Sequence, residues 1–249
     1  MKTSRVILLI MLTTLVGANP SPGESARPLP ALAVFKSRAA WKALSPDYLA
    51  ALAGKFSAAA EAKRFALLCE SSGILANSFA QLAQLAATEP ERALSGTAAA
   101  LTDYGDALSD RTDFYSAIAP LNFAITIEAD CVPAYVALSR AQCGMHDFDT
   151  AIAVLRAAPA VSITGTDSVD FAFALAFAEA EVLITKVQLR WSEDDRRALV
   201  AKLNEARALI QTPASGIAGG EPPAVSGDPF NERLHQLQLV DYLLMKYGP

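Results

Sequence analysis

Carboxylates are the side chains of this sequence whose spacing could most readily do chemistry. Four of them follow one predicted helix to its end: Asp103, Asp106, Asp110 and Asp113. Asp106 and Asp110 are four residues apart, so their charges share one helical face. Paired carboxylates cleave glycosidic bonds or bind cations in some proteins. A solvated acidic face is the commoner role, and the sequence favours it.

Other residue types that carry catalysis are scarce. The two histidines, His146 and His235, are not beside a serine or cysteine in a nucleophile motif. The sequence has no Gly-rich phosphate loop, no Cys-x-x-Cys pair and no His/Cys cluster. It therefore predicts no enzyme, no cofactor and no metal site. The alternative is a small helical hydrolase or ligand-binding domain using the acidic cluster 103–113, with Phe173 and Phe177 lining a groove, although core packing is favoured for the two rings.

Three cysteines allow at most one disulfide. Cys131 lies at a predicted helix junction and Cys143 about ten residues along the next helix. That separation is about 15 Å, beyond the roughly 7 Å that a disulfide allows. A pair that includes Cys69 stays open, and the commoner role of such residues is that of a small buried apolar side chain.

The start of the chain, residues 1–18, has the features of a signal peptide. Lys2 and Arg5 precede the apolar run VILLIMLTTLVGA, which ends in small residues at a cleavage site after Ala18. The run is too short to span a bilayer comfortably, so a cleaved signal is favoured over an uncleaved anchor. Removing the two cations takes the net charge from −5 to −7. We expect an exported protein, periplasmic or secreted, most simply in a bacterial envelope, with no membrane span after cleavage.

The composition predicts an all-α protein. Alanine and leucine dominate, 19% of residues are charged, and no stretch alternates like a half-buried strand. The negative charge argues against nucleic acid as a partner. The predicted segments are a Pro-rich leader at 19–33, a helical domain at 34–211, a Pro/Gly linker at 212–229 and a terminal helix at 230–247. Within the domain we expect helices from Pro46 to about Glu70, at 74–87, at 90–110 and, after an Asp167-Ser168 cap, from about 169 onward. Ser192, with Asp195 three residues on, resembles a capping box and predicts a further helix from residue 193.

One twelve-residue pattern occurs twice in the chain. DFYSAIAPLNFA at 113–124 is matched by DFDTAIAVLRAA at 147–158, and residues 100–124 share nine of 25 positions with 134–158. The stripe Ala117, Leu121 and Ala124 recurs at one helical spacing. Phe114 and Phe148 fall where a ring can fill a turn between antiparallel helices. Pro120 lies inside the first copy, and we expect the helix to bend there rather than begin there.

The 34-residue period of this pattern resembles the tetratricopeptide (TPR) repeat. Two units are clear within 98–165, and the flanking units are degenerate. Tyr135 and Leu138 match the first helix of the second unit, and Gly105 matches the small residue where two helices cross. Thr112 and His146 replace the usual turn glycine. The resemblance implies antiparallel helix-turn-helix repeats stacked as a short right-handed α-solenoid.

The resemblance also implies a binding groove along the first helices. Its matching positions are Thr102, Asp106, Ser109, Asp110, Val136, Arg140 and Cys143, with Ala99, Pro133 and Gly144 beside them. The sequence lacks the Lys and Asn that some family members use to clamp a peptide carboxylate. We therefore expect an adaptor that binds a protein or peptide, as a helix or an extended segment with apolar anchors.

The terminal helix has two possible roles. Its apolar residues fall on one side: Leu234, Leu237, Val240, Leu243 and Leu244. It either seals the last helix pair as a cap, which we favour, or acts as an arm that docks on a partner or a second copy.

Overall fold

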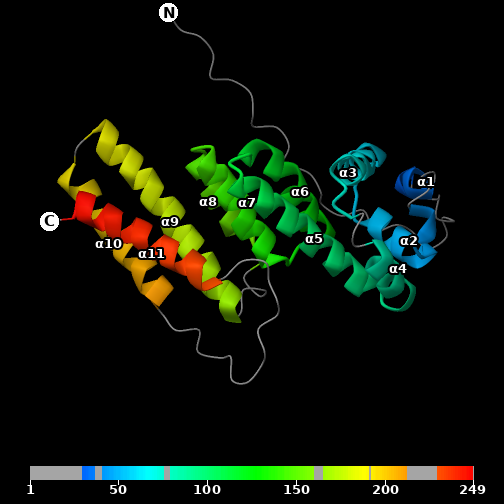
Figure 1. The fold of residues 1–249 in the computed structure, drawn as a ribbon. Helices are drawn as coiled ribbons and strands as arrows, with labels where there is room; N and C mark the ends of the chain where they lie inside the picture. The colour runs from blue at the N-terminus through cyan, green and yellow to red at the C-terminus, as the bar shows by residue number, and fades with distance from the viewer. Residues whose placement is uncertain are drawn as a thin grey trace, which may run out of the picture.

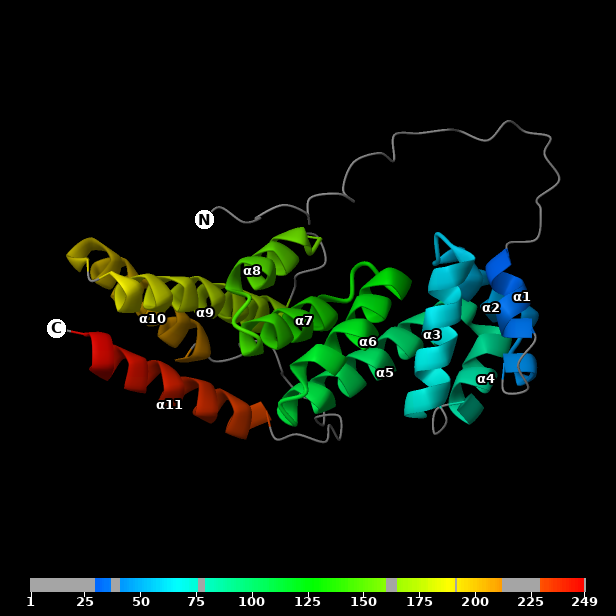
Figure 2. The same cartoon turned by 90° about the horizontal axis from the view of Figure 1, so that it is seen from above.

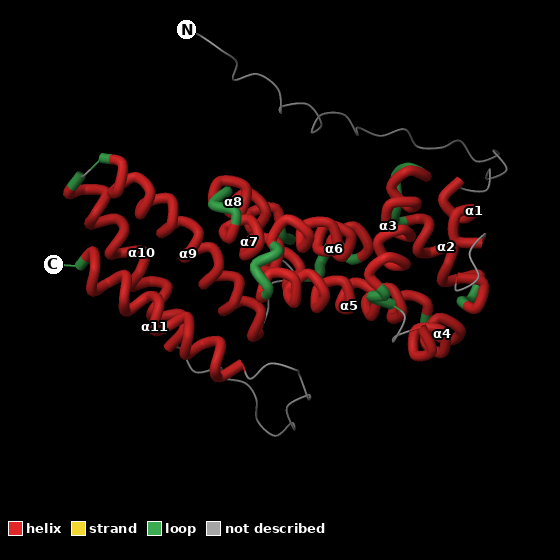
Figure 3. Tube along the Cα trace, turned by 45° about the horizontal axis from the view of Figure 1, so that its top comes forward, coloured by secondary structure: helices red, strands yellow, loops and turns green. Residues whose placement is uncertain are grey.

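The computed structural model describes residues 30–36, 41–75, 79–159, 165–190, 192–211 and 229–248, and these residues form helices joined by turns and loops, with no strand among them. Its α-helices form one row, with α1 to α4 at one end and α9 to α11 at the other (Figures 1 and 3). The elements are α1 Pro30–Lys36, the 3₁₀ turn Trp41–Ala43, α2 Pro46–Gly54, α3 Ala59–Ser72, α4 Phe79–Thr88, α5 Pro90–Asp110, α6 Phe114–Ile127, α7 Val132–Gly144, α8 Phe148–Ala157, α9 Gly165–Leu189, α10 Glu193–Gln211 and α11 Pro229–Tyr247. The all-α prediction is confirmed for these residues.

One predicted helix is wrong. The sequence predicted a single helix from Pro46 to about Glu70, but α2 ends at Gly54 and α3 begins at Ala59. Ala58 is extended, with φ −141° and ψ 147°. Glycine in a helix costs about 1 kcal/mol relative to alanine, and the break places the ring of Phe56 in the core, where it is 5% exposed. Burial of this ring therefore outweighs continuation of the helix.

One helix was not predicted, and two predicted helix starts differ from the structure. α1 begins at Pro30, inside the predicted leader, and α4 begins at Phe79 rather than Ile74. α9 begins at Gly165, so the expected Asp167-Ser168 cap lies within its first turn. The starts of α5 and α10 are confirmed, and α10 has the expected cap, in which the Asp195 N–H donates to Ser192 Oγ at 3.4 Å. α6 runs through Pro120, so the helix does not begin there.

The two copies of the twelve-residue pattern have the same turn. Thr112 and His146 precede the two copies at equivalent positions, and they are the non-glycine residues with positive φ in the described chain, at 63° and 61°. Asp113 and Asp147 then cap α6 and α8 with their side chains, each accepting an N–H three residues on at 3.3 Å. Their own N–H groups donate to the carbonyls of Leu108 and Gln142, at 3.0 and 2.9 Å. A short polar residue at each cap makes this local geometry recur.

The helices pack in sequence, and alternate helices also touch. α5 contacts α6 and α7, α7 contacts α8 and α9, and α9 contacts α10. Figure 2 shows α5, α7 and α9 following one another along the molecule. Preceding α5, α2 contacts both α4 and α5, while α3 reaches across to α6. Helix pairs therefore stack from α5 to α10.

Small residues permit the close packing within the pairs. Gly105 on α5 faces Leu121 on α6, and a Cβ placed on Gly105 would lie within 3.0 Å of three Leu121 carbons. Gly144, at the end of α7, lies against the ring of Phe114 in the same way, with a Cβ 2.5–2.6 Å from ring carbons. Phe114 thus fills the space between one pair and the next, at the start of α6. Phe148 begins α8 at the equivalent position. Its ring lies edge-on to the ring of His146, with 5.8 Å between the ring centroids.

An aromatic core fills the end of the molecule formed by α1 to α4. Phe65 on α3 lies 5.2–6.2 Å between ring centroids from four other rings. These rings are Phe35, Trp41, Phe56 and Phe123. Because Phe123 belongs to α6, the cluster joins the first helices to the stacked pairs.

A charged contact joins α8, α9 and α10. The Glu179 carboxylate on α9 binds Arg156 of α8 at 3.0 Å and Lys202 of α10 at 2.8 Å. Partial burial of Glu179 alone would raise its pKa, but the hydrogen bonds and charges of Lys202 and Arg156 hold the pKa below its ordinary value. The Glu179 side chain is 22% exposed, so this pairing is shielded better than a surface ion pair.

Glu179→Gln is expected to lower the free energy of unfolding by about 1–2 kcal/mol at pH 7. Because the folded-state pKa is depressed, the carboxylate stabilises the fold above its unfolded pKa of about 4.3 and ceases to do so as pH falls through the folded value. Urea denaturation should therefore show the difference between the two proteins shrinking as the pH falls from 7 through the folded-state pKa. The control is Glu205→Gln, which removes only an exposed contact to Lys202. An equal loss in both variants would contradict the prediction.

A further core lies among α9, α10 and α11. Its buried members are Ala176, Ala180, Ile184, Leu199, Leu203, Ala206, Val240, Leu243 and Tyr247. The rings of Phe173 and Phe177 are stacked, with 5.8 Å between their centroids, and they pack against this core. Core packing is the role that the sequence favoured for them. The apolar side of α11 thus packs against α9 and α10. Its role as a cap stays a prediction.

Candidate partner-binding face

The structure brings together three charged residues of the predicted groove. Arg140 on α7 lies 3.5 Å from the carboxylate of Asp106 and 3.8 Å from that of Asp110, both on α5. Asp106 and Arg140 are 34 residues apart, so the pair joins equivalent positions of successive first helices. The side chains are 36%, 71% and 42% exposed for Asp106, Asp110 and Arg140. Contacts this exposed contribute little stability, and the groups stay accessible to another molecule.

Two other predicted groove residues lie inside the helix packing. Thr102 and Ser109 are 5% and 7% exposed. Their hydroxyls donate to the carbonyls of Ala98 and Gly105, four residues earlier, at 2.9 and 3.1 Å. These groups are satisfied within α5 and could reach a partner only if the helix moved.

The remaining predicted residues are partly accessible. Val136 is half-buried on α7, whereas Ala99 on α5 and Pro133 on α7 are exposed. Cys143 is half-buried near the end of α7. We call the accessible set Asp106, Asp110, Val136 and Arg140 the first-helix face. Its binding role stays a prediction.

All three cysteines are free thiols. Burial raises the pKa of the Cys69 thiol to about 12 and raises that of Cys131 as well. Burial, with the negative charge of Glu181 on α9, raises the pKa of Cys143 to about 12. The thiolate is the nucleophilic form, so none of these cysteines is activated for attack in the folded chain.

Cys143 is expected to react with a thiol reagent at pH 8 at least about a hundredfold more slowly in the folded protein than after unfolding. The variant Cys69→Ser/Cys131→Ser isolates this thiol, and absorbance of the released chromophore follows the reaction. The folded rate should keep rising about tenfold per pH unit from pH 8 to pH 10, because the thiolate stays a minor form. A plateau near pH 9 in the folded protein would contradict the raised pKa.

The acidic cluster is divided between different roles. Asp113 caps α6, Asp106 and Asp110 face Arg140, and Asp103 is exposed. Among the described residues there is no group of three His, Cys, Asp or Glu arranged to hold a metal ion. The hydrolase alternative has gained no supporting geometry and stays a prediction of the sequence.

Two features of the site were not anticipated. The Asp106–Arg140 contact had a signal in the sequence, since opposite charges occupy positions one repeat apart. The proximity of Glu181 to Cys143 and to His146 had none, because α9 lies outside the clear repeats. Burial raises the pKa of Glu181, and the charge of His146 opposes that shift.

Within the described residues, every helix is too short or too polar to cross a membrane. The predicted signal peptide, residues 1–18, lies outside that part. Comparison of the chain with protein-family models, with curated proteins and with solved structures found no match.

Proposed function

We propose that this chain is an exported adaptor built from TPR-like units. In this proposal α5–α6, α7–α8 and α9–α10 are successive units of a short right-handed α-solenoid. The first helices α5 and α7 present the first-helix face to another protein or peptide. Export is proposed from the signal-like residues 1–18.

The contact between Asp106 and Arg140 is the observation that carries the proposal. It joins residues 34 positions apart on neighbouring first helices, which is the relation that stacked units of that period produce. The recurring turns at Thr112 and His146 and the contacts of α5 with α7 and of α7 with α9 agree with it. Such stacking places equivalent residues in a line along one side of the helices.

The chemistry of the face limits the partner. Aliphatic Val136 lies among charges of both signs, with two carboxylates for one guanidinium. A helix or extended segment that combines apolar anchors with cationic and anionic side chains would match it. The net charge of the chain makes nucleic acid an unsuitable partner.

The test is the double charge reversal Asp106→Arg/Arg140→Asp. The mature chain, with and without this change, serves as bait, and its partners are captured by crosslinking in its native envelope. The reversal keeps an ion pair within the chain, so the melting temperature should change little, while the charges offered to a partner are inverted. We expect at least a tenfold loss of the captured partners. The control is Asp194→Arg/Arg197→Asp, which reverses an exposed pair on α10.

Capture at the wild-type level by the double reversal would refute the assignment of the first-helix face. Equal loss in the α10 control would show that capture depends on general charge rather than on this face.

A further inference from the structure

The C-terminal helix α11 is held on the α9–α10 pair by one apolar stripe. Val240, Leu243 and Tyr247 are buried there and Leu244 is partly buried. Their spacing of three and four residues places them on one helical side. α11 lies at the same end of the molecule as α9 and α10 (Figures 1 and 2).

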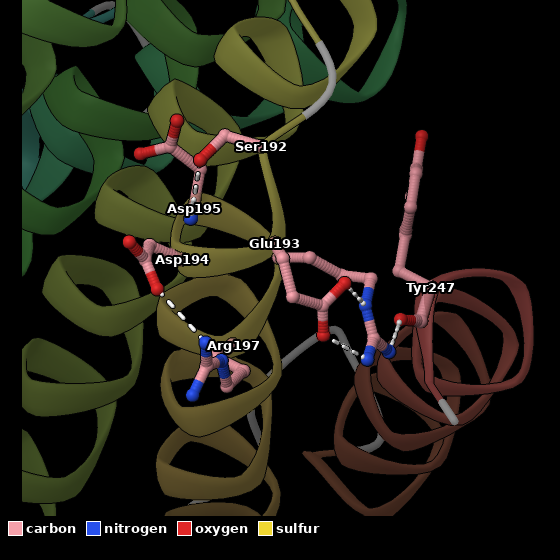
Figure 4. Close-up of polar contacts among 7 residues, drawn as sticks. Ser192, Glu193, Asp194, Asp195, Arg197 and Tyr247 are labelled. Atoms are coloured by element: carbon pink, nitrogen blue, oxygen red, sulfur yellow. Dashed lines mark hydrogen bonds and ion pairs between the residues drawn. The ribbon is translucent and has the colours of Figure 1, made fainter.

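Polar contacts add to the hold at the last turn of α11. Arg196 of α10 donates to the Tyr247 carbonyl oxygen at 3.2 Å while binding Glu193 through two other N–H groups at 2.5 and 3.0 Å (Figure 4). Gln188 donates to the Tyr247 hydroxyl at 3.1 Å. A guanidinium at the carbonyl end of a helix meets the negative end of the helix dipole. Arg207 and Asp241 form a further ion pair at 2.9 Å.

The helices beneath α11 have an interface of their own. α9 and α10 pack directly against each other. The buried cluster that contains Ala176, Ala180 and Ile184 of α9 with three residues of α10 also includes three residues of α11. The Glu179 contacts join the same helices to α8. The α9–α10 pair is therefore joined to the preceding unit through contacts that do not involve α11.

The covalent connection between α10 and α11 differs from a repeat turn. Residues 212–228 separate the two helices and contain Pro213, Pro222 and Pro223 with four glycines. This composition disfavours a helix that would run continuously from α10 into α11. Side-chain contacts with α9 and α10 therefore hold α11 in place.

We propose that α11 is a detachable helix and that the α9–α10 surface beneath it is a docking site for an amphipathic helix. The resident occupant of this site is α11 of the same chain. A tether of this length gives a local concentration on the order of millimolar, so α11 outcompetes weaker guests. A competing helix needs apolar residues at the spacing of Val240, Leu243, Leu244 and Tyr247 and must end near Arg196. This site is separate from the first-helix face.

The test uses the full chain with a protease recognition sequence inserted between residues 216 and 221. After cleavage, a fluorescent peptide of residues 229–249 is added and its binding is followed by anisotropy. We expect the peptide to replace the cleaved segment while circular dichroism of the remaining chain keeps the helical signal of α1 to α10. The uncleaved protein should bind the peptide at least about tenfold more weakly, because its own α11 competes.

Two peptide variants probe the inner and outer sides of α11. Leu243→Asp places a charge on the buried side and should weaken binding at least about tenfold. Met245→Asp alters a residue that is 78% exposed and should change binding less than about twofold. Equal binding of both variants would overturn the proposal. It would also be overturned if the peptide failed to enter the cleaved protein, or if loss of α11 unfolded α9 and α10.

Discussion

Replacing Gly105 by valine is expected to lower the free energy of unfolding by about 3 kcal/mol or more. A Cβ at this position lies within 3.0 Å of three carbons of Leu121, which is fully buried. Leu121 cannot move aside without disturbing the α5–α6 contact. For a chain of this size the expected fall in melting temperature is about 6–12 °C, measurable by circular dichroism.

Gly96 in the same helix supplies the control. A Cβ there would meet only Leu82, at 3.5 Å, which is ordinary contact. Gly96→Ala should therefore raise stability by about 0.5–1 kcal/mol through helix propensity, whereas Gly105→Ala should lower it despite the same gain. Alanine effects of the same sign at both positions would contradict the close packing of α5 on α6.

Phe65→Ala is expected to cost about 3–5 kcal/mol. The ring is fully buried and meets four other aromatic rings, so its removal leaves a cavity with walls from α1, α3 and α6. Urea denaturation gives the loss. Trp41 lies 6.0 Å from Phe65 between ring centroids, so its fluorescence should shift to longer wavelength when the cavity admits water. Trp191→Phe in both proteins isolates this signal.

Leu67 is the matched control on α3. It is 48% exposed, so Leu67→Ala should change stability by less than about 0.5 kcal/mol and leave the Trp41 emission unchanged. Similar losses for the two α3 variants would show that the aromatic cluster does not join the first helices to α6 as the structure places it.

Features that depend on a few neighbouring residues could be predicted from the sequence. The Asp caps and the recurrence of the turns follow from side chains bonding to backbone within three residues. The start of α5 at Pro90 and the Ser192 cap of α10 have the same local origin. Helix content also follows from composition, because most positions favour helix whatever they pack against.

The candidate face could be predicted only in part. The repeat period placed Asp106 and Arg140 at equivalent positions, and the structure brings them within 3.5 Å. The repeat period did not reveal that Thr102 and Ser109 are buried and that their hydroxyls donate hydrogen bonds to carbonyls of their own helix. Which side of α5 stays accessible depends on where α4, α6 and α7 pack, and those contacts arise between residues far apart in sequence.

By itself the sequence determined the helical class, the register of the two repeated turns and the apolar stripe of the last helix. Each follows from interactions that reach no farther than one or two helical turns. Only the tertiary structure decided the break between α2 and α3, the joining of α3 to α6 through Phe65 and Phe123, and the seat of α11 on α9 and α10. The physical reason is that burial of large rings and aliphatic stripes outweighs local preference, and the partners for that burial come from distant parts of the chain.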